Sequence, residues 1–157
     1  MAEWTSIAEQ TVNPGESIVF TNNPVPCTRG FVRGRNGDGS FLLSGWVPRR
    51  ITSCPCNQNG RSAVYFVDFG ANIAIPTGGT EGEISVAISL DGNTLPATIM
   101  SVTPSAVEEY FNVSRATNVE IWNGCCQTVS IRNISGQPIL VQNATIDFSR
   151  PDLGVTL

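Results

Sequence analysis

The sequence predicts an all-β protein, folded as one antiparallel β-sandwich or jelly roll of about ten short strands. First, apolar and polar residues alternate with the period of two that a strand requires, as in residues 118–122 and 127–134. Second, turns containing glycine, such as Asn123-Gly124 and Ser135-Gly136, separate these stretches. Third, ten prolines and fifteen glycines leave no stretch with a helical apolar period. We expect 157 residues to form a single domain with its core at about residues 10–149 and a short extension at each end.

The first third of the chain contains two predicted strands and a hairpin. Residues 4–12 alternate loosely, and residues 17–21 follow a turn at Pro14-Gly15 as a second strand. The Asn-Gly-Asp-Gly segment at 36–39 is a strong turn signal, so we expect residues 40–43 to form the next strand. Residues 47–61 are irregular and form the longest predicted surface loop, a place where binding residues often lie.

The stretch 63–69 is apolar on both faces. The two faces that alternation defines are Ala63, Tyr65, Val67 and Phe69 on one side, and Val64 and Phe66 on the other. An antiparallel strand with one wet face should instead alternate cleanly between apolar and polar residues. This strand is therefore either central in a well-covered sandwich or covered by another subunit.

The second half of the chain predicts a series of hairpins. Residues 83–90 alternate most cleanly, and a tight turn at Asp91-Gly92 leads into residues 93–102. In the first of these strands Ile84, Val86, Ile88 and Leu90 are expected to face the core, and Glu83, Ser85, Ala87 and Ser89 the solvent. The remaining strands are predicted at residues 111–114, 118–122, 127–134 and 139–149.

Charge and composition exclude several classes of function. All nine basic residues are arginine, there is neither lysine nor histidine, and thirteen acidic residues give a net charge of −4. This balance argues against a nucleic-acid partner, because binding to phosphate groups requires a basic surface. Without histidine or lysine the common general bases are missing, so we expect no enzymatic activity and no cofactor. No segment is long and apolar enough for a membrane span, and the first ten residues lack a signal-peptide pattern.

Five cysteines are candidates for cross-links. Their spacing does not match the usual ligand spacing of zinc sites, so we expect no metal. Disulfides, including disulfides between subunits because the count is odd, are one interpretation, and reduced thiols are the other. The five residues are Cys27, Cys54, Cys56, Cys125 and Cys126.

A resemblance to a known family extends this prediction. Residues 65–69, 84–93, 115–123 and 139–148 resemble the ordered landmarks of the C1q/TNF-like jelly roll. The version that they resemble is the bacterial and phage type, found in collagen-like surface proteins, spore-coat proteins and virion proteins. The resemblance implies a ten-stranded jelly roll that assembles as a tight homotrimer. No Gly-X-Y repeat precedes the domain, which favours a stand-alone cap, knob or decoration protein over the tip of a collagen stalk.

The trimer would use aromatic residues on the strands that are apolar on two sides. We expect its interface to include Tyr65, Phe66, Phe69, Phe111, Trp122 and Phe148. Loops at residues 24–31, 47–61 and 103–110 would face a partner. Trp46 immediately precedes the second of these loops and lies near Arg49 and Arg50. It is a candidate for stacking on a sugar, although Trp46 is equally compatible with the core.

The expected function is that of a non-enzymatic, trimeric structural or surface-display protein. The leading hypothesis is a phage virion component, either a capsid decoration or a fibre knob, that acts in assembly or attachment to other virion proteins. The alternative is a binding module on a spore or cell surface that recognises a glycan or a protein through its loops.

Overall fold

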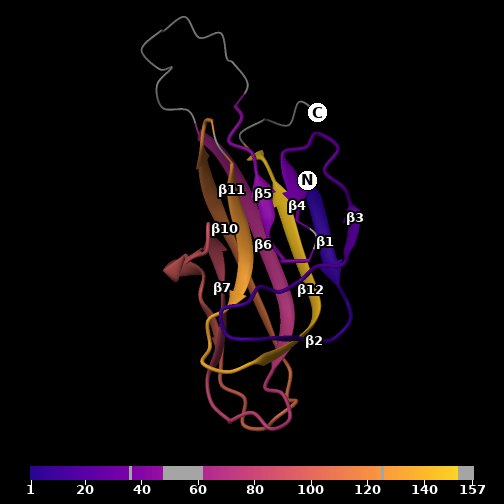
Figure 1. Cartoon of the computed structure of the whole chain (residues 1–157), viewed down its shortest axis with the longest axis vertical. Helices are drawn as coiled ribbons and strands as arrows, with labels where there is room; N and C mark the ends of the chain where they lie inside the picture. Colours follow the sequence, from indigo (N-terminus) through magenta and orange to yellow (C-terminus); the bar gives the residue numbers. More distant parts are fainter. Residues whose placement is uncertain (36, 48–61, 125, 152–157) are drawn as a thin grey trace, which may run out of the picture.

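The computed structural model describes residues 1–35, 37–47, 62–124 and 126–151, and it confirms the all-β prediction. Two antiparallel sheets, each of six strands, pack face to face as a sandwich (Figure 1). The strands are β1 (Ala2–Ser6), β2 (Gln10–Val12), β3 (Asn22–Val25), β4 (Val32–Gly34), β5 (Phe41–Leu43), β6 (Ser62–Ala74), β7 (Ile84–Leu90), β8 (Asn93–Thr94), β9 (Met100–Val102), β10 (Phe111–Trp122), β11 (Gln127–Asn133) and β12 (Ile139–Ser149).

The strand order mixes distant parts of the sequence, as a jelly roll requires. The first sheet, which we call sheet A, has the order β10-β6-β12-β1-β3, with β2 also paired to β12. The second, sheet B, has the order β4-β5-β11-β7-β8, with β9 also paired to β7. The long strands β6, β10 and β12 run along most of the molecule and form the centre of sheet A (Figure 1).

The core lies between the inner faces of the two sheets and reaches from Ala2 to Phe148. Rings of Trp4, Phe41 and Phe148 meet there with centroids 4.9–5.8 Å apart, in tilted and edge-on contacts. Alternate residues of the central strands, including Tyr65, Val67 and Phe69, are almost completely buried. The period of two in the sequence therefore does place one face of each long strand in the core.

The N-terminal segment departs from the prediction in two places. Residues 4–12 form two strands, β1 and β2, that both pair with β12. Residues 17–21 are not a strand, because only Ser17 makes a ladder contact, an isolated bridge to Arg132. The side chain of Gln10 takes the place of a partner strand: it accepts a hydrogen bond from the Val19 amide at 2.9 Å and donates to the Val19 carbonyl at 2.8 Å.

Strand β7 also departs from the prediction, since both of its faces are buried. Ser85 is covered through hydrogen bonds to Ser101 and Ser135. Ala87 lies opposite Arg132, whose guanidinium extends across the sheet to the carbonyls of Gly15 and Gly92. A long side chain such as that of Arg132 shields small neighbouring side chains from solvent. The alternation therefore predicts the strand correctly, but the face that was expected to be exposed to solvent is buried.

Helical structure is minimal in the described part of the chain, where η2 (Pro96–Thr98) is a short 3-10 turn after β8. No helix among the described residues has the length and apolar character needed to cross a membrane.

Candidate functional site

The outer face of sheet A is the broadest exposed surface that the central strands provide. Register places alternate residues of β6, β10, β12 and β1 side by side on this face, from Asn118 and Phe66 to Ser149. Its described residues include carboxylates but no arginine, because the arginines of the chain lie on other faces and in loops. Most of its other residues are neutral and polar, so the exposed aromatic residues and the carboxylates are its distinctive groups.

One half of this face carries an apolar strip. Phe66 on β6 is 39% exposed and Trp122 on β10 is 62% exposed, which is unusual for such large side chains. Val64 lies between them, and Ala116 flanks Phe66 diagonally. We call these four residues the apolar strip. Glu120 lies directly opposite Val64 and places a carboxylate beside these residues. Large apolar side chains that are exposed together on one face are typical of a protein–protein contact.

The other half carries a row of three carboxylates. Glu3 on β1 pairs with Asp147 on β12, and Asp147 pairs with Asp68 on β6, so the three side chains lie next to one another across three strands. Burial, followed by the charges of Glu3 and Asp68, raises the pKa of Asp147. Among the described residues no three acidic, cysteine or histidine side chains are arranged to hold a metal ion.

The structure divides the six residues predicted for the trimer interface. Phe66 and Trp122 lie on the outer face of sheet A, as an interface requires. The prediction for Tyr65, Phe69 and Phe148 is wrong, because their side chains are buried inside the single chain and have no surface to offer a second subunit. Phe111 shares the core-facing side of β10 with Val113, so it does not reach the outer face although it is 36% exposed.

The predicted binding residue Trp46 is exposed and stacked, not part of the core. Its ring lies 5.8 Å from that of Phe31 with an angle of 19° between the planes, and 52% of the residue is exposed. Arg150 donates a hydrogen bond to the Trp46 carbonyl at 3.1 Å, and its guanidinium lies over the rings of Phe31 and Tyr65. Sequence reasoning missed Arg150, because nothing local links the end of β12 to residues 31–46.

Two predicted partner residues, Arg49 and Arg50, lie outside the described residues, as do Cys54, Cys56 and Cys125. The two described cysteines, Cys27 and Cys126, carry free thiols. Cys27 is half-buried against the core and Cys126 is exposed. Cross-linking through the other three cysteines stays a prediction.

The predicted partner loops do not lie together. Residues 103–110 connect β9 to β10 at one end of the sandwich, whereas β12 ends and β5 leads into residues 44–47 at the other end (Figure 1). Tyr110 in the former loop donates to Glu9, and burial together with Glu9 raises the pKa of Tyr110 to about 12. Residues 24–31 begin inside β3 and belong to the same end as Trp46.

Comparison with known proteins identifies the fold. No protein-family model matches the sequence, and no curated protein sequence matches it. The globular domain of zebrafish complement 1qA protein is similar over 96% of this chain and 95% of that chain, with a TM-score of 0.61 and 12% identity. Eiger TNF from S. frugiperda is similar over 95% of this chain and 90% of that chain, with a TM-score of 0.65 and 10% identity. The protein therefore has the C1q/TNF-like jelly-roll fold.

Proposed function

We propose that the protein is a non-enzymatic homotrimer of the bacterial and phage type of this fold, and that it serves as a structural component of a virion. The observation that carries the proposal is the apolar strip on the outer face of sheet A, where Phe66 is 39% and Trp122 62% exposed in the single chain. Burial of such side chains between copies stabilises an assembly, since removing apolar surface from water contributes roughly 25 cal/mol per Å².

The occupant that best fits the strip is another copy of the same chain. The strip runs along β6 and β10, two strands 13 and 12 residues long, so it presents a straight and regular surface. The residues that flank the strip are polar, and they can form the polar rim of a contact. They are Ser62, Asn118, Glu120 and Ser149. A cyclic trimer would repeat this one contact three times around an axis.

The proposed absence of enzymatic activity rests on the residue types that the chain contains. The chain contains neither histidine nor lysine, so the usual nucleophile–base pairs cannot form. The row of carboxylates formed by Glu3, Asp147 and Asp68 lies on the strand surface of sheet A, which does not exclude water as an active-site cleft does. In a virion such a trimer would act in assembly or attachment, as a capsid decoration or a fibre knob.

A second candidate function is favoured by one observation, the exposed stack of Trp46 on Phe31. Exposed aromatic rings with a neighbouring arginine provide a surface on which a sugar can stack. On this basis the chain would be a binding module of a spore or cell surface that recognises a glycan or a protein.

The test of the trimer is the mass of the purified chain by light scattering, with and without reductant. We expect a mass near three times 16.8 kDa in both conditions. Phe66→Ser and Trp122→Ser should each lower the mass toward that of the monomer. Phe111→Ser is the matched control, because Phe111 is nearly as exposed as Phe66 but does not lie on the outer face.

A monomeric wild-type chain at concentrations up to about 100 μM would contradict the proposed assembly. The place where the protein is found distinguishes a virion component from a module of a spore or cell surface. Mass spectrometry of purified particles should find the chain at a fixed copy number relative to the major capsid protein, whereas its recovery from cell or spore envelopes alone would support the second candidate. Loss of glycan binding in Trp46→Ala would support it further.

A further inference from the structure

A cleft of about 640 Å³ lies between the two sheets, on the side of the sandwich where each sheet has a short edge strand. Strand β3 is the edge of sheet A and β4 is the edge of sheet B, and both lie on this side (Figure 1). Pockets that bind small molecules have volumes of roughly 300–1,000 Å³, so this cleft is large enough to hold one. We call it the edge cleft. Its lining includes Trp4, Thr21, Arg33, Gly34, Arg35 and Ser40.

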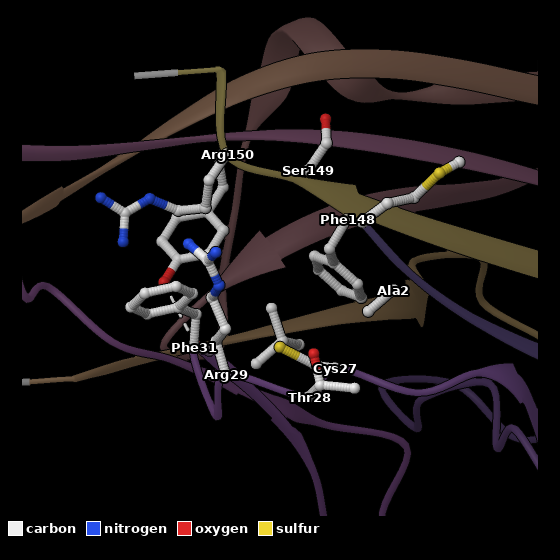
Figure 2. Close-up of a pocket in the computed structure, with 11 residues that line it drawn as sticks. Ala2, Cys27, Thr28, Arg29, Phe31, Phe148, Ser149 and Arg150 are labelled. Atoms are coloured by element: carbon white, nitrogen blue, oxygen red, sulfur yellow. Dashed lines mark hydrogen bonds between the residues drawn. The ribbon is translucent and has the colours of Figure 1, made fainter. Parts of the chain in front are cut away.

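A smaller pocket of about 290 Å³ lies next to the edge cleft, and Cys27 belongs to the lining of both. Figure 2 shows this smaller pocket, whose apolar wall includes Ala2 and Phe148. Each of these two residues is only 1% exposed, so the wall presents almost no surface to a ligand. The rim of the edge cleft is accessible instead, because residues such as Thr21 and Arg33 are exposed.

The indole N–H of Trp4 reaches the edge cleft without a hydrogen-bond partner. Trp4 is 8% exposed, and its N–H donates to no described residue. The unpaired polar side-chain atoms that are fully enclosed in the described chain belong to Ser89 and Thr145, so the Trp4 N–H is not one of them and stays open to the cleft. An indole N–H can only donate, so its partner must be an acceptor atom from outside the chain.

Gly34 on β4 provides the space beside this N–H. A Cβ atom at Gly34 would lie 3.2 Å from Nε1 of Trp4, which is closer than ordinary van der Waals contact. Gly34 is not among the glycines with a positive φ angle, so its backbone conformation does not require glycine. A glycine inside a strand often marks a place where a ligand approaches closely.

The charged part of the lining is basic. Arg33 and Arg35 line the edge cleft, and none of its described lining residues is acidic. Asp38 lies beside the rim, where it accepts hydrogen bonds from the Ser40 amide at 2.8 Å and the Ser40 hydroxyl at 2.6 Å. These hydrogen bonds, and to a smaller extent the charge of Arg35, lower the pKa of Asp38. One carboxylate thus faces two arginines, and the remaining positive charge favours a ligand with a carboxylate.

The rest of the accessible lining is polar. The hydroxyl of Thr21 makes no hydrogen bond with a described residue, and that of Ser40 keeps lone pairs that can accept. On their open sides β3 and β4 also present backbone N–H and C=O groups that no other described strand pairs. Val32 and Phe41 at the floor are 6% and 2% exposed and offer little apolar surface. The edge cleft therefore suits a ligand that is rich in hydroxyl groups.

We propose that the edge cleft binds an acidic sugar, which is a hydroxylated ring that carries a carboxylate. An oxygen of the sugar accepts the hydrogen bond of the Trp4 N–H, and the carboxylate lies in the positive field of Arg33 and Arg35. The site is separate from the stack of Trp46 on Phe31. It does not depend on the trimer, because residues of a single chain line it.

The first experiment follows the indole N–H signals of the full chain by NMR. The chain has three tryptophans, and Trp46 and Trp122 do not line the edge cleft, so their signals are internal controls. Galacturonate is the probe, methyl galactoside supplies a similar ring without the charge, and acetate supplies the charge without the ring. We expect galacturonate to shift the Trp4 signal saturably, at the lowest concentration of the three, and to leave the other two signals in place.

A second experiment tests the space that Gly34 provides. Gly34→Ala should weaken galacturonate binding about tenfold or more, because the added methyl group crowds the Trp4 N–H. Gly136→Ala is the matched control, because Gly136 also lacks a positive φ angle and an added Cβ there has no atom within 4 Å. Thermal unfolding verifies that both variants are folded.

A third experiment tests the charge. Arg35→Gln should weaken the binding of galacturonate but not that of methyl galactoside. Arg29→Gln is the control, because Arg29 is an exposed arginine that does not line the edge cleft. A Trp4 signal that galacturonate does not move, or unchanged affinity in Gly34→Ala, would overturn the site. Equal binding of galacturonate and methyl galactoside would overturn the assignment to an acidic sugar.

Discussion

Asp147 on β12 lies directly opposite Asp68 on β6, on the outer face of sheet A. Glu3 on β1 faces Asp147 from the other side, so Asp147 has a carboxylate neighbour on both adjacent strands. Like charges at directly opposed positions destabilise a sheet. Burial, Glu3 and Asp68 together raise the pKa of Asp147, which means that the folded chain binds this proton more tightly than the unfolded chain.

The first prediction is that Asp147→Asn stabilises the chain at pH 7.5, by about 0.2–1 kcal/mol, because it removes repulsion with both neighbours. A carboxyl with a raised pKa destabilises the folded state above that pKa and has no effect below the pKa of the unfolded chain. The gain in Asp147→Asn should therefore shrink as the pH falls toward about 4. Urea unfolding at both pH values measures it, and a gain that is independent of pH would contradict the explanation.

The second prediction concerns Asp91, whose pKa is lowered in the folded chain, whereas that of Asp147 is raised. The Asp91 carboxylate accepts hydrogen bonds from the Thr128 amide at 2.8 Å and from the Gln127 side chain at 2.9 Å. The amide of Thr128 has the largest effect and lowers the pKa of Asp91. Burial acts in the opposite direction, and the side chains of Gln127 and Thr128 lower the pKa further, so the net shift is downward. Asp91→Asn should destabilise the chain at pH 7.5 by about 0.5–1.5 kcal/mol. The wild-type advantage should disappear as the pH falls through the lowered pKa of Asp91. Unfolding curves of both proteins between pH 7.5 and 3 provide the measurement.

The third prediction is that self-association strengthens at acidic pH. The outer face of sheet A brings Glu3, Asp68, Asp147 and Glu120 to any contact between copies, and no described arginine compensates them there. Asp147, whose pKa is raised by burial, Glu3 and Asp68, is the group whose protonation removes both repulsion and the cost of burying charge. We expect the dissociation constant of the assembly to fall about tenfold or more from pH 8 to pH 5.

Sedimentation equilibrium at the two pH values tests this, and Asp68→Asn combined with Asp147→Asn should remove most of the difference. An assembly of unchanged strength at both pH values would indicate that the carboxylate row lies outside the contact.

The fourth prediction separates two glycines of the loop between β4 and β5. Gly37 and Gly39 both have positive φ angles, 94° and 71°. A Cβ atom on Gly39 would lie 2.2 Å from the carbonyl oxygen of Ile18, whereas one on Gly37 would have no atom within 4 Å. Gly37→Ala should lower the free energy of unfolding by about 1 kcal/mol, because only the positive φ angle is unfavourable for alanine. Gly39→Ala should cost clearly more, because the Ile18 backbone must move. Thermal unfolding of both variants measures the difference, and equal losses would contradict the clash.

Much of the fold was predictable because its signals are local. Alternation identified β6, β7 and β11, and the glycine turns marked most of the hairpins. The segment at residues 17–21 was not predictable as an irregular one, because the side chain of Gln10 binds the Val19 backbone. The neighbouring amides of Ile18 and Thr21 donate to the carbonyls of Ile131 and Thr5, on two different strands, and no pattern in the segment itself indicates these partners. The buried outer face of β7 has a similar origin, since Arg132 covers it from another strand.

The surfaces were less predictable than the strands. Alternation separates Phe66 from Tyr65 and Phe69 correctly, but it does not say which face of a strand with two apolar faces enters the core. That choice depends on the partner sheet. The contacts of Arg150 with Phe31 and Trp46 depend on where β12 ends, which brings together distant parts of the chain. Pairing at long sequence separation leaves no local signal.

The fifth prediction uses two aromatic residues of β6 that point in opposite directions. Phe69 is 1% exposed and lies in the core, whereas Phe66 is 39% exposed on the outer face. Phe69→Ala should lower the free energy of unfolding by about 3–5 kcal/mol, through lost burial and the cavity that remains. Phe66→Ala should leave the unfolding of the isolated monomer nearly unchanged and weaken only self-association. Denaturation at a protein concentration low enough to populate the monomer separates the effect on folding from the effect on self-association. A large loss in monomeric Phe66→Ala would mean that its ring is packed within its own chain, which would remove the apolar strip as a contact between copies.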